Sequence, residues 1–543
     1  MTTRALAVVA YCVIATIVSR AQIGKITQQD WVTSRADAQR TSWIRTDIVI
    51  SPESMQKAGF QLQWKATLDN QRRQLNALNP GVVVGNLGFG SIPLSFITGS
   101  GNRVFAIDND TGALFWQRTF GSTGIGGTPQ CPGGITSAAT RPATVLPTTP
   151  SWRGLQARPP YTSGVGAPGE GVPAYLMGRA GRGAPAPAAV PSTPVRGAAA
   201  PAAAPAAPVP PVVYALSAEG QLHTLGVYSG KDVARPLSWL PPNAHASDLI
   251  ALNNIVYTAT MHGCEGVADG VWAVNLDDQR SVVRTWRTEG GSPSGAPAFG
   301  SDGTLYVAVG GGVTAAINGY ANAIVALDPD DLTIRDWFTD PSTDFVTAPV
   351  VFKTGAREVV AAATRDGSIV LLDAMSVGGP AHATALHRSS ATGRARSAFV
   401  PGGLATWMDS SGTAWLLLPA ETTISAVKVS AGNGPPTLEP VWTSRQMHAP
   451  IVPLIINGVA FVVSSGEFVP QVGATLAAAD RARQSVPAVL YALDAVTGRE
   501  LWSSGKTITS FAHGPSVWPG IGQVHIATSD NTVYAFGFPL ERY

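Results

Sequence analysis

A small set of arginine and histidine side chains has the chemistry to bind a charged ligand. They lie in loops that precede short apolar segments. Guanidinium and imidazole groups that converge on a concave surface suit an anionic or quinone-like ligand. The candidates are Arg394, Arg396, His448 and His513, with His262 two residues before Cys264. A solvated or loop-capping role is the alternative for each, and His223, inside an apolar segment, is expected in the core.

Most carboxylates are explained by turns. An Asp that follows an apolar strand can accept hydrogen bonds from the backbone N–H groups of the next turn. Aspartates in this position are Asp108, Asp110, Asp328, Asp330, Asp331, Asp373 and Asp494. No pair of carboxylates stands apart from such turns, which argues against a polysaccharide lyase or hydrolase, and no metal-ligand set is recognised.

The N-terminus has the layout of a cleavable secretory signal. Arg4 precedes an apolar run of about 14 residues, and Ser19-Arg20-Ala21 supplies small residues where a signal peptidase reads them. We expect residues 1–21 to be removed, leaving a periplasmic or secreted chain without an integral membrane segment. A buried first strand or helix is the alternative.

Two cysteines follow the signal, Cys131 and Cys264, both in Gly-rich loops. In an oxidising compartment they can form a disulfide, and two unpaired thiols are the alternative. Too few further ligands lie near them for a metal site. No Cys-x-x-Cys-His motif is present, so covalent c-type haem is not expected.

The composition favours many turns and short strands. The 543 residues include 58 Gly and 42 Pro, which argues against a mostly helical chain. The net charge of +2 excludes a nucleic-acid binder that relies on a broad basic face.

One motif occurs twice in full, as A-x-D-x-x-T-G-x-x-x-W. The Asp closes a turn, the Gly supplies a positive φ, and the Trp ends the next strand and packs against a neighbouring unit. Each copy is therefore predicted to be an antiparallel hairpin with an aromatic dock. The docking positions are Ala106, Asp108, Gly112 and Trp116, and Ala492, Asp494, Gly498 and Trp502.

Weaker copies recur along the chain and bring the number of hairpins to eight. Each is part of a unit of about four short strands, the size of one propeller blade. The last unit lacks its outer strand, and residues 60–64 at the other end can supply it and close the ring. The sequence therefore predicts an all-β, eight-bladed β-propeller of four-stranded antiparallel blades, with an N-terminal strand closing the last blade.

This pattern resembles the quinoprotein alcohol dehydrogenase-like superfamily, whose repeat is the same tryptophan-docking motif. Residues 35–42 and 55–64 are also similar to the start of that family. The resemblance implies an eight-bladed propeller and, for enzymes, pyrroloquinoline quinone (PQQ) and calcium in the axial channel, with a catalytic Asp. Many such enzymes cap the quinone with a disulfide between adjacent cysteines, and this chain has no adjacent pair.

The expected organisation is a signal peptide at 1–21, an N-terminal segment at 22–59 and a propeller at 60–543. An insertion at 122–211 interrupts it, and its later part is dominated by Ala and Pro, which cannot bury a core. A tolerated loop is the favoured interpretation, and a partner-binding or wall-spanning arm is the alternative.

Two functions remain open at this level. The first is an exported, non-catalytic propeller that binds a protein partner or a small anionic or quinone ligand. The alternative is a periplasmic PQQ-dependent dehydrogenase that oxidises an alcohol or sugar and passes electrons to an external acceptor.

Overall fold

The structure is a computed structural model, and it describes residues 31–539 except 48, 85–91, 122–126, 144–210, 277–281, 312–318, 343, 392–396 and 432–433. The predicted signal peptide and most of the predicted insertion therefore lie outside the described residues. Among the described residues, no helix has the length and apolar character needed to cross a bilayer.

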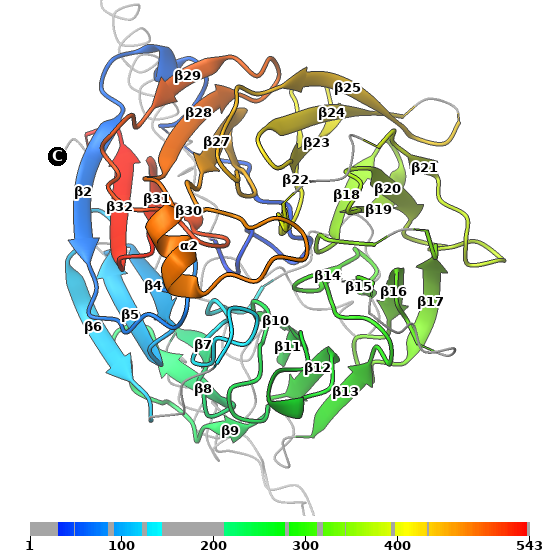
Figure 1. Cartoon of the computed structure of the whole chain (residues 1–543), viewed down its shortest axis with the longest axis horizontal. Helices are drawn as coiled ribbons and strands as arrows, with labels where there is room; N and C mark the ends of the chain where they lie inside the picture. The colour runs from blue at the N-terminus through cyan, green and yellow to red at the C-terminus, as the bar shows by residue number, and fades with distance from the viewer. Residues whose placement is uncertain are drawn as a thin grey trace, which may run out of the picture.

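Eight sheets stand around one axis and form a wheel (Figure 1). In blades 1 to 6 the chain runs from the inner strand to the outer strand through antiparallel neighbours, blade 7 adds β1 parallel to its inner strand, and blade 8 takes its outer strand from the N-terminal part of the chain. This confirms the predicted all-β, eight-bladed propeller. Short strands with buried residues on both faces suit blades that pack face to face.

The first four blades have these strands. Blade 1 is β3 (Val82–Val84), β4 (Leu94–Gly99), β5 (Arg103–Asp108) and β6 (Leu114–Thr119). Blade 2 is β7 (Val212–Leu216), β8 (Gln221–Gly226) and β9 (Leu237–Ser238). Blade 3 is β10 (Ile250–Leu252), β11 (Ile255–Thr260), β12 (Gly270–Asn275) and β13 (Val283–Arg287). Blade 4 is β14 (Ala298–Phe299), β15 (Leu305–Val309), β16 (Ala323–Leu327) and β17 (Ile334–Thr339).

The other four blades complete the wheel. Blade 5 is β18 (Val350–Thr354), β19 (Arg357–Ala363), β20 (Ile369–Asp373) and β21 (His387–Arg388). Blade 6 is β22 (Ala405–Met408), β23 (Ala414–Pro419), β24 (Ile424–Ser430) and β25 (Thr437–Thr443). Blade 7 is β26 (Leu454–Ile456), β27 (Val459–Ser464), β28 (Val489–Asp494) and β29 (Glu500–Ser503), with β1 (Trp43–Ile44) added. Blade 8 is β30 (Val517–Pro519), β31 (Gln523–Ala527), β32 (Thr532–Gly537) and β2 (Gln61–Thr67).

Among the described residues, three short helical segments lie outside the blades. They are η1 (Ser54–Gln56), η4 (Cys264–Gly266) and α2 (Ala478–Gln484).

The ring is closed by the N-terminal strand. β2 pairs with β32 in the antiparallel sense and places Trp64 opposite Ala535 and Lys65 opposite Tyr534. The last three strands of the chain thus gain an outer neighbour from its beginning. This confirms the predicted closure, which leaves the last blade without an unpaired edge at that point.

The core lies between blades. Tyr306 and Ile324 of blade 4 pack with Val360 and Leu372 of blade 5 in one buried cluster. Fully burying an aliphatic side chain of this size is worth about 2 kcal/mol. Because each blade shares its buried faces with two neighbours, the blades stabilise one another around the wheel.

Tryptophans connect blades at their outer ends. At three junctions, the indole of an outer strand lies on the glycine of the next blade's turn, in the pairs Trp64 on Gly112, Trp116 on Gly230 and Trp442 on Gly498. In each pair the indole Nε1 donates to a carbonyl of that turn, at Asn109 (3.3 Å), Val227 (2.8 Å) and Ala495 (3.1 Å). The turns themselves are held by Asp108 and Asp494, whose Oδ1 atoms accept backbone N–H groups two and three residues later.

The inner edge of blade 2 comes from within the range expected as an insertion. Thr140 and Tyr214 exchange two backbone hydrogen bonds, of 2.9 and 2.7 Å. The segment around Thr140 therefore occupies the place of an inner strand, and the range 122–211 includes part of a blade. Its small residues, Thr136 to Thr140 with two alanines in the middle, lack the alternation of apolar and polar residues that marks a strand.

Candidate functional site at one mouth of the axial channel

The axis of the wheel is occupied by the chain's own residues 31–47, named here the axial segment (the dark blue trace near the centre of Figure 1). It makes hydrogen bonds to every blade, at or beside the inner strand in blades 1 to 7 and at the turn after the inner strand in blade 8. In blades 1 to 4, Trp31 O accepts from Val83 N, Val32 O accepts from Arg141 N, Thr33 Oγ1 donates to Leu249 O, and Ala38 O accepts from Phe299 N. In blades 5 to 8, Gln39 O accepts from Val351 N, Thr41 O from Thr406 N, Ser42 O from Ile455 N, and Asp47 Oδ2 from Gly522 N.

The axial segment is buried and locally strained. Arg35, Ala36, Arg40 and Ser42 all have left-handed φ values, between 57° and 79°. A side chain in this region is unfavourable, and glycine is the residue that adopts it without cost. The surrounding blades therefore hold the segment in a conformation that its own residues would not favour.

Two arginines of the axial segment differ sharply in their partners. Arg40 donates to the carbonyls of Pro297, Ser34 and Asp248 and to the Thr33 hydroxyl, at 2.8 to 3.2 Å. Arg35 makes no hydrogen bond through its guanidinium to any described residue, and its Nη1 is fully buried. Burial, with repulsion from Arg40, lowers the pKa of Arg35 to about 9, and burial lowers that of Arg40 to about 10.

The Arg35 guanidinium lies beside Gly403. A Cβ built on Gly403 would overlap Nη1 of Arg35 and would also approach Val452. Gly403 precedes β22 by two residues and Val452 precedes β26 by two, so both belong to loops that lead into inner strands. These loops surround one end of the channel, which we call the mouth.

A buried ion cluster lies on one side of the mouth. Glu467, between β27 and β28, accepts from His513 Nδ1 at 2.8 Å and pairs with Arg481 of α2. Burial would raise the pKa of Glu467, but His513 and Arg481 together lower it, so the carboxylate is ionised. Figure 1 shows α2 and its loop over the face of the wheel, toward the centre. The cluster therefore fixes this loop beside the channel.

Two histidines and a disulfide lie on the other side. Cys131 and Cys264 are joined by a disulfide, and Gln130 O is 2.6 Å from His245 Nδ1. The rings of His245 and His262 are 5.1 Å apart. Burial lowers the pKa of His245 to about 4, with further lowering by His262 and by His513. His245 lies in the loop that leads into β10 and His513 in the loop that leads into β30, so both stand in loops that enter an inner strand, as those of the mouth do.

The residues expected from the sequence fall in different places. His513 and His262 lie at the mouth, whereas His448 is exposed in the loop before β26. Arg394 and Arg396 lie outside the described residues. His223 is buried and pairs with Asp232 at 2.9 Å, beneath the ring of Phe120.

Several mouth residues were missed by sequence reasoning. They are Arg35, Arg40, His245, Glu467 and Arg481. Arg35 and Arg40 stand in a segment whose similarity to a family was noticed, but nothing in their spacing indicates burial. His245 lies in a loop that leads into an inner strand, and this position was a usable signal.

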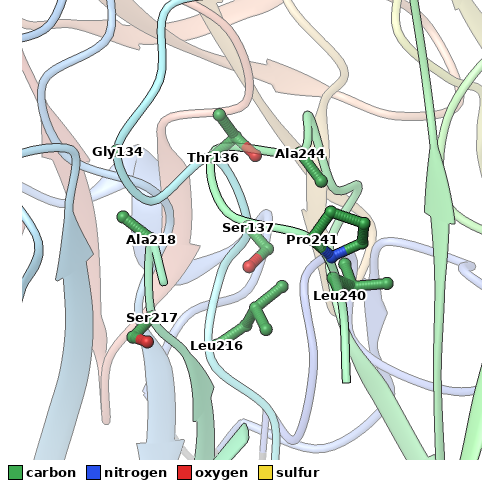
Figure 2. Close-up of a pocket in the computed structure, with 9 residues that line it drawn as sticks. All are labelled: Gly134, Thr136, Ser137, Leu216, Ser217, Ala218, Leu240, Pro241 and Ala244. Carbon is green, nitrogen blue, oxygen red and sulfur yellow. The ribbon is translucent and has the colours of Figure 1, made fainter. Parts of the chain in front are cut away.

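A small pocket opens between blades 2 and 3 next to the disulfide-bearing loop (Figure 2). Figure 2 shows Thr136, Ser137 and Ser217 with the apolar side chains of Leu216 and Leu240 around it. No charged side chain is among its nine lining residues. An anion therefore has better partners at the mouth than in this pocket.

The described residues show no calcium site built from carboxylates. A calcium ion needs several carboxylate or amide oxygens. The described part of the chain contains no group of three or more His, Cys, Asp or Glu side chains that could hold a metal. Its two disulfide-bonded cysteines are 133 residues apart in sequence.

The fold defines the class of protein. It is an eight-bladed propeller of the kind found in quinoprotein alcohol dehydrogenases, as the sequence pattern predicted. No protein-family model and no curated protein matches the sequence.

Solved structures match over nearly the whole chain. The quinohemoprotein alcohol dehydrogenase ADHIIG from Pseudomonas putida HK5 aligns with TM-score 0.58 at 11% identity, covering 95% of this chain and 82% of that one. The quinohemoprotein alcohol dehydrogenase from Comamonas testosteroni gives TM-score 0.54 at 14% identity, with the same coverage. A europium-containing methanol dehydrogenase gives 0.56 at 11%, covering 94% and 98%. At these identities the likeness concerns the fold.

Proposed function

We propose that this chain is an exported, non-catalytic propeller that binds an anionic small ligand at the mouth of its axial channel. The supporting observation is the mouth itself. It combines Arg35, whose guanidinium has no hydrogen-bond partner among the described residues, with the loops that carry His245 and His513. The loop that carries α2 is fixed beside them by Glu467. The axial segment occupies the axis and places Arg35 next to Gly403 in a loop of the mouth, so the mouth is the proposed side of approach.

The chain's own residues divide the work of binding. Arg35 presents a guanidinium that no described residue neutralises. His513 is held by Glu467 through Nδ1, which leaves its Nε2 available to a ligand. The disulfide holds the loop that carries Gln130, and Gln130 orients His245. Such pre-organised polar groups in a concave site give orientation and specificity.

An extracytoplasmic location is part of the proposal. The disulfide between Cys131 and Cys264 supports it, because disulfides persist in oxidising compartments. The signal-like N-terminus supports it independently. Fractionation of cells producing the full chain tests this point: we expect the mature protein outside the cytoplasm and resistant to thiol alkylation unless reduced.

The second candidate function is a PQQ-dependent dehydrogenase, favoured by the likeness of fold to three such enzymes. One experiment separates the two. The mature protein is mixed with PQQ and calcium, and dye reduction with alcohols and sugars is followed against the same mixture without the quinone. We expect no quinone-dependent turnover. Stoichiometric quinone binding with turnover rejects the non-catalytic function.

A further inference from the structure

Burying the Arg35 guanidinium costs free energy that no hydrogen bond to a described residue offsets. Its side chain is 9% exposed, and its guanidinium has no hydrogen-bond partner among the described residues. A buried, unpaired charge is strongly unfavourable. Arg40, five residues further along, is an arginine with a structural role, since all three of its guanidinium nitrogens donate hydrogen bonds.

The nearest carboxylates do not pair with Arg35. Asp37 accepts from Thr41 N, Thr41 Oγ1 and Arg45 Nη1. Asp248 Oδ1 accepts from Ala138 N at 2.8 Å. Both carboxylates raise the pKa of Arg35 from a distance, yet burial dominates and keeps it at about 9. The charge therefore still lacks a direct counter-ion.

The backbone accommodates Arg35 at two places. Arg35 itself has φ 61°, where glycine is favoured over any side chain. Gly403 faces it, and a Cβ there would overlap Nη1. Gly402 has a left-handed φ of 77°, but Gly403 does not. A glycine is therefore required at position 403 because the Arg35 guanidinium approaches its backbone closely, and not because of its φ.

We propose that Arg35 is the anchor for one oxyanion group, a carboxylate or a phosphate, of a small ligand that enters through the mouth. The inference rests on the proposed function for the route of entry. An oxyanion supplies the counter-charge and accepts N–H groups that Arg35 now directs at no partner. Gly403 packs closely against Nη1, and Val452 lies next to Gly403.

The test is calorimetric titration of the mature protein with phosphate, sulfate and oxalate, at constant ionic strength set with chloride. We expect saturable, one-to-one binding of at least one oxyanion. Phosphate and oxalate separate a phosphate ligand from a carboxylate ligand. Arg35→Gln is expected to weaken binding at least about tenfold, because charge-assisted bonds are the strong ones. Gly403→Ala is expected to weaken it as well.

Two further variants distinguish a binding role from a structural one. Arg445→Gln removes an exposed arginine paired with Glu500 and is expected to leave binding unchanged. Arg35→Gly removes both the unpaired charge and the backbone strain. Without added oxyanion, we expect its denaturation midpoint to equal or exceed that of the wild type, and with oxyanion we expect no increase in the midpoint.

The outcomes are decisive in both directions. No saturable binding by any of the three oxyanions overturns the inference, as does unchanged binding in Arg35→Gln. A lower midpoint for Arg35→Gly in the absence of oxyanion makes Arg35 structural and also overturns it. Quinone-dependent turnover with oxyanion binding still lost in Arg35→Gln rejects the proposed function and leaves the anchor in place.

Discussion

The contact between Trp64 and Gly112 closes the wheel, and replacing Gly112 by alanine tests how strongly. Gly112 has φ 72°, and an added Cβ would lie 2.7 Å from Trp64 Cδ2. The indole also donates to Asn109 O at 3.3 Å. The ring must therefore move away from the turn, which loosens the junction between blade 8 and blade 1.

The expected cost has three contributions. A left-handed alanine costs about 1–2 kcal/mol. Forcing an extra methyl into a packed contact costs about 1–3 kcal/mol. Loss of the indole hydrogen bond adds about 1 kcal/mol. Gly112→Ala should therefore lower the free energy of unfolding by about 3–6 kcal/mol.

Gly412→Ala is a matched control. Gly412 has φ 81°, and nothing lies within 4 Å of the position of its Cβ. It carries the backbone strain alone, so we expect a loss of about 1–2 kcal/mol. In Gly498→Ala, the added Cβ would lie 2.6 Å from Trp442 Cδ2. This variant tests the same contact at the junction of blades 6 and 7, and its loss of stability should be similar to that of Gly112→Ala.

The assay is urea unfolding followed by far-UV circular dichroism, which reports the strands and is insensitive to small movements of one indole. The quantity of interest is the difference between Gly112→Ala and Gly412→Ala, since it isolates the tryptophan contact from the φ strain. If the two variants lose the same stability within about 0.5 kcal/mol, the docking contact contributes nothing and the reasoning is refuted.

Three further predictions concern the disulfide, a buried histidine and the mouth cluster. Reducing Cys131–Cys264, which spans 133 residues, should lower the free energy of unfolding by up to about 5 kcal/mol, and a Cys131→Ser, Cys264→Ser double variant should match it and ignore reductant. Burial holds the pKa of His525 at about 3, so folding favours its neutral form. Stability is then full above about pH 6.5 and falls with acidification, by about 2 kcal/mol at pH 5, and urea midpoints at both pH values should show a smaller drop for His525→Gln. Glu467→Gln leaves Arg481 and His513 without their shared carboxylate, so trypsin should cut at Arg481 and Arg483 faster, whereas Glu500→Gln, at an exposed pair, should not change the rate.

The blade pattern was predictable because its causes are local. The spacing from Asp108 to Trp116 specifies a turn and the strand after it within eleven residues of the repeat. The missing outer strand of the last unit is visible in the same way, and β2 pairs with β32 as expected. The inner edge of blade 2 was not predictable, because Thr140 and its neighbours show no alternation of large apolar and polar residues.

The mouth was only partly predictable. His513 was found because a loop leading into an inner strand must face the axis. Its partner Glu467 lies 46 residues away on another blade, and no spacing rule connects the two. The partner of Trp116 is likewise distant, at Gly230 beyond the insertion.

The sequence by itself determined the wheel, since strand alternation, turn glycines and docking tryptophans act within each repeat and need no distant information. Only the tertiary structure decided what fills the axis. Closing eight blades encloses one axis, and residues 31–47 run along it and make hydrogen bonds to all eight blades. That enclosure removes water from Arg35, which nothing in the sequence distinguishes from other arginines. It leaves the guanidinium buried with no hydrogen-bond partner among the described residues.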